Sequence, residues 1–239
     1  MKKLVAFTLA EVLIVLGIVG IIAQETIPTL VNNVNQQSYV TSLKKSYTTF
    51  NEALVLMAIE YNCIGDLQAT GVFDSTGTAT EMNQQFGAAL LPHFKSLKTC
   101  GSAIGCFSQN VAGTFNGSGG RNSNLYNNTV YYKFIAADGA YYSLESYGEC
   151  HPETATGYTK EVCGTVSIDV NGEKGPNNWG RDVFLYYITN GKGALLYAPG
   201  SFDDPWSGSW RDSDLCDTAN FDNWNCASRI IDEGWAMNY

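Results

Sequence analysis

Histidine is scarce in this chain, and the residue patterns that mark most active sites are missing with it. The 239 residues include two histidines, His93 and His151, which lie in unrelated surroundings. The sequence contains no G-x-S-x-G motif, no phosphate-binding loop and no paired-carboxylate signature of the kind that acid–base catalysis uses. We therefore expect a protein that is not an enzyme.

Basic residues are also few. The chain has 14 Lys and Arg against 23 Asp and Glu, which gives a formal net charge of −9. An acidic surface repels phosphate groups, and the one dense basic pair, Lys44-Lys45, is typical of a solvated helix face. The composition therefore argues against a nucleic-acid partner.

Charge is almost absent from a long apolar run near the start of the chain. Between residues 7 and 23, Thr8 and Glu11 are the only polar side chains, and a run of this length is at the lower limit for crossing a lipid bilayer. Lys2 and Lys3 precede it and favour a cytoplasmic N-terminus by the positive-inside rule. The run predicts a single membrane pass with the remainder of the chain outside.

Glu11 requires an explanation, because a carboxylate inside an apolar segment is costly. A cleaved secretory signal peptide fits poorly, since residues 21–23 lack a small-x-small cleavage site. A plain membrane anchor gives Glu11 a local role, because Thr8-Leu-Ala-Glu11 matches the T-x-x-E capping box at a helix start.

A third interpretation joins these features. The basic Lys2-Lys3, then Ala6, then Phe7-Thr-Leu-Ala-Glu11 and an apolar helix resemble the N-terminal signal of the type IV pilin and type II secretion pseudopilin superfamily, in which Gly usually stands where this chain has Ala6. The resemblance implies that prepilin peptidase removes a leader, residues 1–6, and that Phe7 becomes an N-methylated first residue. It also implies assembly with other pilin-like subunits through an inner-membrane assembly platform.

The same resemblance gives Glu11 an intermolecular role. After cleavage, the new amine of Phe7 is a suitable partner for the Glu11 carboxylate of a neighbouring subunit, and a misregistered subunit would leave both charges unpaired. The implied location is the bacterial inner membrane for the precursor, followed by a periplasmic pseudopilus or an extracellular pilus. The alternative from another class is a monomeric membrane-anchored binding or adhesive domain.

We expect one long helix over residues 7–62, with its membrane and assembly part at about 7–31. Gly17 and Gly20 weaken the helix, and Pro28 removes a backbone donor. Family pilins often have an opened segment between such glycines and a proline, which implies an opening between Gly20 and Pro28. An ordinary helix boundary at Pro28 is the alternative. Beyond it, an apolar stripe at helical spacing predicts packing along one face: Val40, Leu43, Tyr47, Phe50, Leu54, Met57 and Tyr61.

Residues 63–239 are long enough for one head domain with its own core. A short helix is expected over 79–91, ended by Pro92, and a Gly/Ser/Asn-rich loop over 113–128. Alternating patterns around Asp-Gly and Asn-Gly turns predict two hairpins, 129–135 with 140–145 and 183–189 with 194–197, and a further strand at 164–170. The predicted fold is α+β, with an antiparallel sheet packed on the long helix.

Seven cysteines follow the membrane segment, on the side where thiols are oxidised. The pairs closest along the chain are Cys100 with Cys106, Cys150 with Cys163, and Cys216 with Cys226, although spacing does not fix connectivity. The odd count leaves at least one cysteine free or paired between chains, and elimination suggests Cys63. A zinc site at Cys150, His151 and Cys163 is the alternative to a disulfide there.

One loop has spacing that resembles the start of a calcium-binding loop. Asp169, Asn171, Glu173 and Asp182 offer side-chain oxygens around a glycine turn, but the closing acid comes too late for an EF-hand. Some pseudopilins carry a calcium ion in this part of the fold, so a structural calcium is one interpretation. A turn stabilised by Asx side chains and glycine is the other. No other cofactor is expected.

Overall fold

The computed structural model describes residues 8–107, 125, 128–152, 161–191, 195–198, 216, 224 and 226–239. The chain divides into two compact units, Met1–Ser38 and Tyr39–Tyr239, and helix α1 (Leu9–Glu60) contributes residues to both. Apart from Leu125 and Asn128, the loop predicted over 113–128 falls outside the described ranges.

Helix α1 is continuous through Pro28, so the opening expected between Gly20 and Pro28 is not found, and neither is a helix boundary at Pro28. The proline removes one backbone donor from the helix. Two hydroxyls supply additional local bonds: Thr26 Oγ1 donates to the Ile22 carbonyl at 2.9 Å, and Thr29 Oγ1 donates to the Glu25 carbonyl at 3.3 Å. Neither bond replaces the one that Pro28 removes, because the carbonyl left without its usual donor belongs to Gln24.

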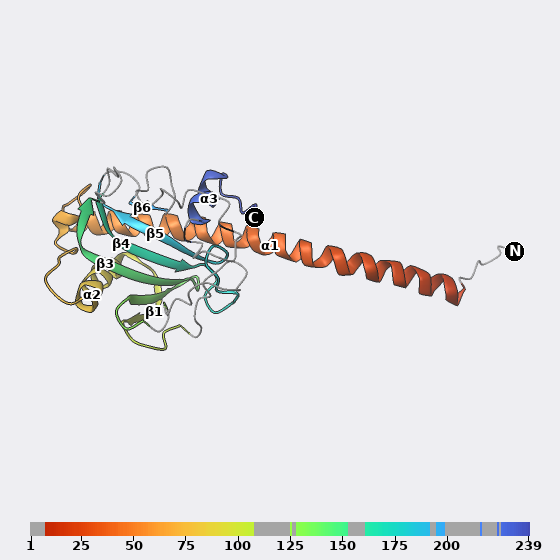
Figure 1. Cartoon of the computed structure of the whole chain (residues 1–239). Helices are drawn as coiled ribbons and strands as arrows, with labels where there is room; N and C mark the ends of the chain where they lie inside the picture. Colours follow the sequence, from red (N-terminus) through yellow and green to blue (C-terminus); the bar gives the residue numbers. More distant parts are fainter. Residues whose placement is uncertain are drawn as a thin grey trace. The chain divides into compact units, whose positions relative to one another are not determined.

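The second unit is built on one antiparallel sheet whose strands follow one another in chain order (Figure 1). The strands are β1 (Ser96–Gly101), β2 (Tyr132–Ala136), β3 (Tyr141–Pro152), β4 (Glu161–Asp169), β5 (Val183–Thr189) and β6 (Leu196–Tyr197). Each strand pairs with the next, and the longest ladder joins β3 to β4. This is a simple meander in which every neighbour in the sheet is also a neighbour in the sequence.

The core of the second unit lies between one face of the sheet and residues 39–60 of α1. Phe50 is fully buried there, with its ring stacked on Tyr142 of β3 at 5.8 Å between centroids and near Phe94 at 6.0 Å. The predicted stripe supplies this contact, although its last member, Tyr61, is 43% exposed. The α+β fold with a long N-terminal helix and an antiparallel sheet is therefore confirmed.

Helix α2 (Ala79–Leu90) lies beside β2 and β3 and begins with a complete capping box. The Glu81 amide donates to Thr78 Oγ1, and the Thr78 amide donates to Glu81 Oε2 at 2.8 Å, so two otherwise unpaired donors are satisfied. The chain then tightens into the short 3₁₀ helix η2 (Leu91–His93), which contains Pro92. Another such turn, η1 (Gln68–Thr70), follows α1.

A second, smaller apolar cluster covers part of the opposite face of the sheet, which we call the outer face. It contains Phe107, Tyr141, Trp179, Val183 and Leu185, together with Cys106 and Leu125. Near the C-terminus, α3 (Cys226–Asp232) contributes Ala227 and Ile230 to the main core instead. The sheet therefore has apolar contacts on both faces, which agrees with the almost continuous burial of β4 and β5.

Candidate functional site

The first unit presents an uncovered apolar helix. Within the described part of the chain, α1 is the one helix that is long and apolar enough to cross a membrane. Its large side chains are exposed on all sides of the helix: Leu9, Val12, Leu13, Ile14, Val15, Leu16, Ile18, Val19, Ile21 and Ile22. So much exposed apolar surface requires lipid or other protein to cover it.

Glu11 lies in the first turn of this helix and closes a capping box with Thr8. Its Oε2 atom accepts hydrogen bonds from both the backbone amide and the hydroxyl of Thr8, each at 2.8 Å. In return, the Glu11 amide donates to Thr8 Oγ1 at 3.3 Å. The local role that the sequence offers for Glu11 is therefore present, and both bonds from Thr8 reach the same carboxylate oxygen.

The other residues predicted to act in assembly lie on the same helix or outside the described ranges. A methyl group added at Gly17 or Gly20 would meet no atom within 4 Å, so nothing in the chain itself requires glycine there. Both positions leave the helix surface free for close approach by another helix. The predicted cleavage point, Ala6 and Phe7, falls outside the described residues.

Of the four residues of the predicted calcium loop, the two aspartates accept from backbone donors, whereas Asn171 Oδ1 is buried and has no hydrogen-bond partner among the described residues. Asp169 Oδ1 accepts from the Asn171 and Gly172 amides at 3.2 and 2.9 Å. Asp182 accepts from the amides of residues 177 and 178 at 2.9 and 2.7 Å, while its burial raises the pKa of the carboxyl group. Glu173 is exposed and hydrogen-bonds the hydroxyl of Tyr141.

These contacts describe an Asx-stabilised loop, in which each buried carboxylate organises the turn that contains it. Across the described ranges, no group of three or more His, Cys, Asp or Glu side chains is arranged to hold a metal ion. The two aspartates therefore have a structural role in the loop, and the calcium ion stays a prediction.

All seven cysteines fall within the described ranges, and six of them form disulfides. The bridges are Cys100–Cys106, Cys150–Cys163 and Cys216–Cys226, and Cys63 is the free thiol. The Cys150–Cys163 bridge joins β3 to β4 beside the irregularity between Ser146 and His151. Because this bridge uses both sulfurs, the zinc site considered for Cys150, His151 and Cys163 is wrong.

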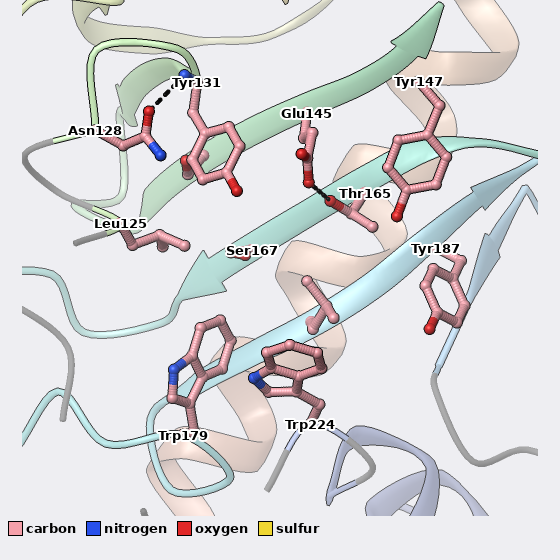
Figure 2. A pocket seen from close by; sticks show the side chains of 12 residues that line it. Leu125, Asn128, Tyr131, Glu145, Tyr147, Thr165, Ser167, Trp179, Tyr187 and Trp224 are labelled. Atoms are coloured by element: carbon pink, nitrogen blue, oxygen red, sulfur yellow. Dashed lines mark hydrogen bonds between the residues drawn. The ribbon is translucent and has the colours of Figure 1, made fainter. Parts of the chain in front are cut away.

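The structure also brings together several residues that the sequence marks only as members of strands. Tyr131, Glu145, Tyr147, Thr165 and Tyr187 line one cavity on the outer face of the sheet (Figure 2). The available signal was the composition of the alternate strand positions: they carry aromatic rings and hydroxyls, where a solvated sheet face usually carries lysine and glutamate.

Comparison with known proteins finds no relative of this chain. No protein family model matches the chain, no curated protein matches it, and no solved structure matches it.

Proposed function

We propose that this chain is a structural subunit of a type IV pilus-like or pseudopilus filament. In this proposal it is made as a precursor in the bacterial inner membrane, processed by prepilin peptidase between Ala6 and Phe7, and polymerised through α1 with other pilin-like subunits at an assembly platform. The observation that carries the proposal is the carboxylate of Glu11 in the first turn of an uncovered apolar helix.

The chemistry of assembly follows from charge pairing in an apolar medium. While the subunit is in the membrane, Glu11 near the helix start is tolerated because its capping bonds and the adjacent interface stabilise it. In the filament, the Phe7 amine of one subunit pairs with Glu11 of its neighbour. Removing one member of a dry ion pair costs about 3–5 kcal/mol, because the other charge stays buried and unpaired.

Apolar packing supplies the remaining association energy. The exposed side chains between Leu9 and Ile22 leave lipid and pack against the same segments of neighbouring subunits. Gly17 and Gly20 permit close contact between these helices, since no side chain projects from either position. Glu11 then fixes the register, whereas the apolar surface alone would allow several.

The capping box favours a second candidate function. Because Thr8 already satisfies Glu11 within one chain, the helix also suits a membrane anchor that never polymerises and that presents a monomeric binding or adhesive domain. The two functions differ in whether the negative charge of Glu11 matters beyond its own helix.

Substitutions separate the two roles of Glu11. Glu11→Gln keeps the capping geometry, since Gln also serves at this position of the box, but removes the charge. Thr8→Ala removes the capping hydroxyl and keeps the charge. The filament proposal predicts that Glu11→Gln abolishes sedimentable polymer in the native host while the subunit remains in the membrane fraction, and that Thr8→Ala retains polymer.

Glu25→Gln is the matched control, because it neutralises another carboxylate of the same helix and should leave assembly unchanged. Polymer that survives Glu11→Gln but not Thr8→Ala would favour the capping role and contradict the charge-pair mechanism. Intact mass adds an independent result: the mature chain should begin at N-methylated Phe7, whereas a mature chain that still begins at Met1 would leave only the anchored domain.

A further inference from the structure

The outer face of the sheet carries a cavity of about 360 Å³ that the filament proposal does not use. Figure 2 shows it across β3, β4 and β5, with helix α1 behind the sheet. The size lies within the range of small-molecule sites in proteins and is sufficient for one or two sugar-sized rings. All of its described lining residues belong to the second unit, so the inference below is independent of the membrane segment.

The strand register builds the floor of this cavity. Ser143 lies opposite Ser167, and Glu145 lies opposite Thr165, which in turn lies opposite Tyr187. Because alternate residues of a strand face the same side, the neighbours of these residues, such as Tyr142 and Val166, lie in the main core instead. The floor therefore consists of three small hydroxyl side chains and one carboxylate.

One of these hydroxyls is buried without a hydrogen-bond partner. Ser143 is 4% exposed, it lines the cavity, and its Oγ makes no hydrogen bond to any described residue. A buried polar group in that condition costs free energy unless a ligand or water completes it. Ser143 thus gives the cavity floor a group that a ligand with hydrogen-bonding groups, or a water molecule, can complete.

Glu145 is the acidic group of the site and is held in place by its neighbours. Thr165 Oγ1 donates to Glu145 Oε2 at 3.2 Å, and Tyr131 lines the same cavity. Burial raises the pKa of Glu145, which means that its charged form is short of hydration. Additional donors from a ligand would relieve that shortage.

Aromatic rings form the walls. The rings of Trp179 and Trp224 lie 6.3 Å apart between centroids and meet at 65°, while Tyr131, Tyr147 and Tyr187 stand on the other sides (Figure 2). Trp224 is 45% exposed and Tyr147 is 36% exposed. Large rings left accessible beside a polar floor are suited to stacking on a flat ligand.

We propose that this cavity binds a saccharide. A pyranose ring has an apolar C–H face that stacks on an aromatic side chain, and hydroxyls around its edge that donate to Glu145 and pair with Ser143 and Thr165. A quaternary ammonium ion is the other ligand that aromatic pockets with a carboxylate recognise. The quaternary ammonium group itself has no hydrogen-bond donor or acceptor and does not complete the Ser143 hydroxyl, so the polar floor favours the sugar.

The test is saturation-transfer NMR on the full chain in a polyoxyethylene detergent. Maltoside detergents carry the proposed ligand, and phosphocholine detergents carry the competing one, so both are avoided. The probes are the methyl glycosides of glucose, galactose, mannose and N-acetylglucosamine, the chains maltotriose and chitotriose, and choline chloride. We expect transfer to at least one glycoside. Stronger transfer to a trisaccharide than to its single ring indicates a polysaccharide ligand, and equal transfer indicates a free sugar.

Two variants and one control test whether the saccharide binds in this cavity. Trp224→Ala removes an exposed ring and should weaken binding at least about fivefold. Glu145→Gln should weaken it about tenfold. Tyr61→Ala, which removes a ring of similar exposure at the end of α1, should leave it unchanged.

Unchanged affinity in both Trp224→Ala and Glu145→Gln would overturn the proposal. Absence of transfer to every glycoside would also overturn it, and transfer to choline without any glycoside would assign the cavity to cations instead. None of these outcomes affects filament assembly, so failure here is distinguishable from failure of the filament proposal.

Discussion

Replacing Phe50 by alanine tests the packing of α1 on the sheet, which is the contact that organises the second unit. Phe50 has no exposed surface, and its ring packs beside both Tyr142 and Phe94, at centroid distances of 5.8 and 6.0 Å. Alanine has high helix propensity, so the substitution leaves α1 itself intact. Any loss of stability in Phe50→Ala therefore reports on the packing of α1 against the sheet.

The expected cost is large because both neighbours are held by other contacts. Tyr142 is stacked on Phe134 at 4.9 Å, and Phe94 meets Phe134 edge-to-face at 5.1 Å, so neither ring is free to collapse into the vacated space. A buried Phe→Ala change in a core of this kind costs about 3–5 kcal/mol. For a unit of this size, that corresponds to a fall in Tm of about 6–20 °C.

The assay is thermal and urea unfolding of the full chain in detergent, followed by near-ultraviolet circular dichroism, which reports the aromatic core. The matched control is Leu56→Ala on the same helix, where the side chain is 48% exposed and the expected cost is below about 0.5 kcal/mol. If Phe50→Ala costs no more than Leu56→Ala, the packing of this helix face on the sheet is refuted.

Two further predictions concern α2 and the outer face. A methyl group at Gly87 would lie 2.2 Å from ring atoms of Tyr132. Gly87→Ala should therefore lower the free energy of unfolding in urea by about 1–3 kcal/mol, although alanine has the better helix propensity. A gain in stability would contradict this close approach. Burial raises the pKa of the Glu145 carboxyl group, so this group stays protonated to higher pH in the folded chain than in the unfolded chain. The free energy of unfolding therefore falls as the pH rises above the ordinary pKa of 4.5. Glu145→Gln should flatten that decline in Tm between about pH 4 and pH 7, and an unchanged slope would show that Glu145 does not cause it.

The parts of the fold that were predicted from sequence carry strong periodic signals. The stripe at spacings of three and four after residue 39 gave the buried face of α1, and β5 has the bounds that the alternation at 183–189 predicted. The hairpin around Asp138-Gly139 also formed, since β2 pairs with β3. In each case one face is buried against the core, so the pattern has a physical cause.

The features that the sequence did not predict have no periodic pattern of apolar residues to mark them. Strand β1 is largely exposed, so no apolar alternation marks it, and it is held by backbone pairing to β2. The cavity was missed because Glu145 and Thr165 look like ordinary outward positions until the register places them opposite each other. Pro28 was overinterpreted, because one proline removes a single backbone hydrogen bond and does not by itself end a long helix.

The strand order of the sheet bears on how the second unit folds. Each strand after β1 pairs with the strand that precedes it in the chain, so the sheet can grow one strand at a time, and the segment to be closed is long only between β1 and β2. The three bridges are also local, with separations of 6, 13 and 10 residues, and each joins two cysteines that have no other cysteine between them. Each bridge therefore closes the shortest loop open to its cysteines, and Cys63, whose nearest cysteine is Cys100, is the one left over.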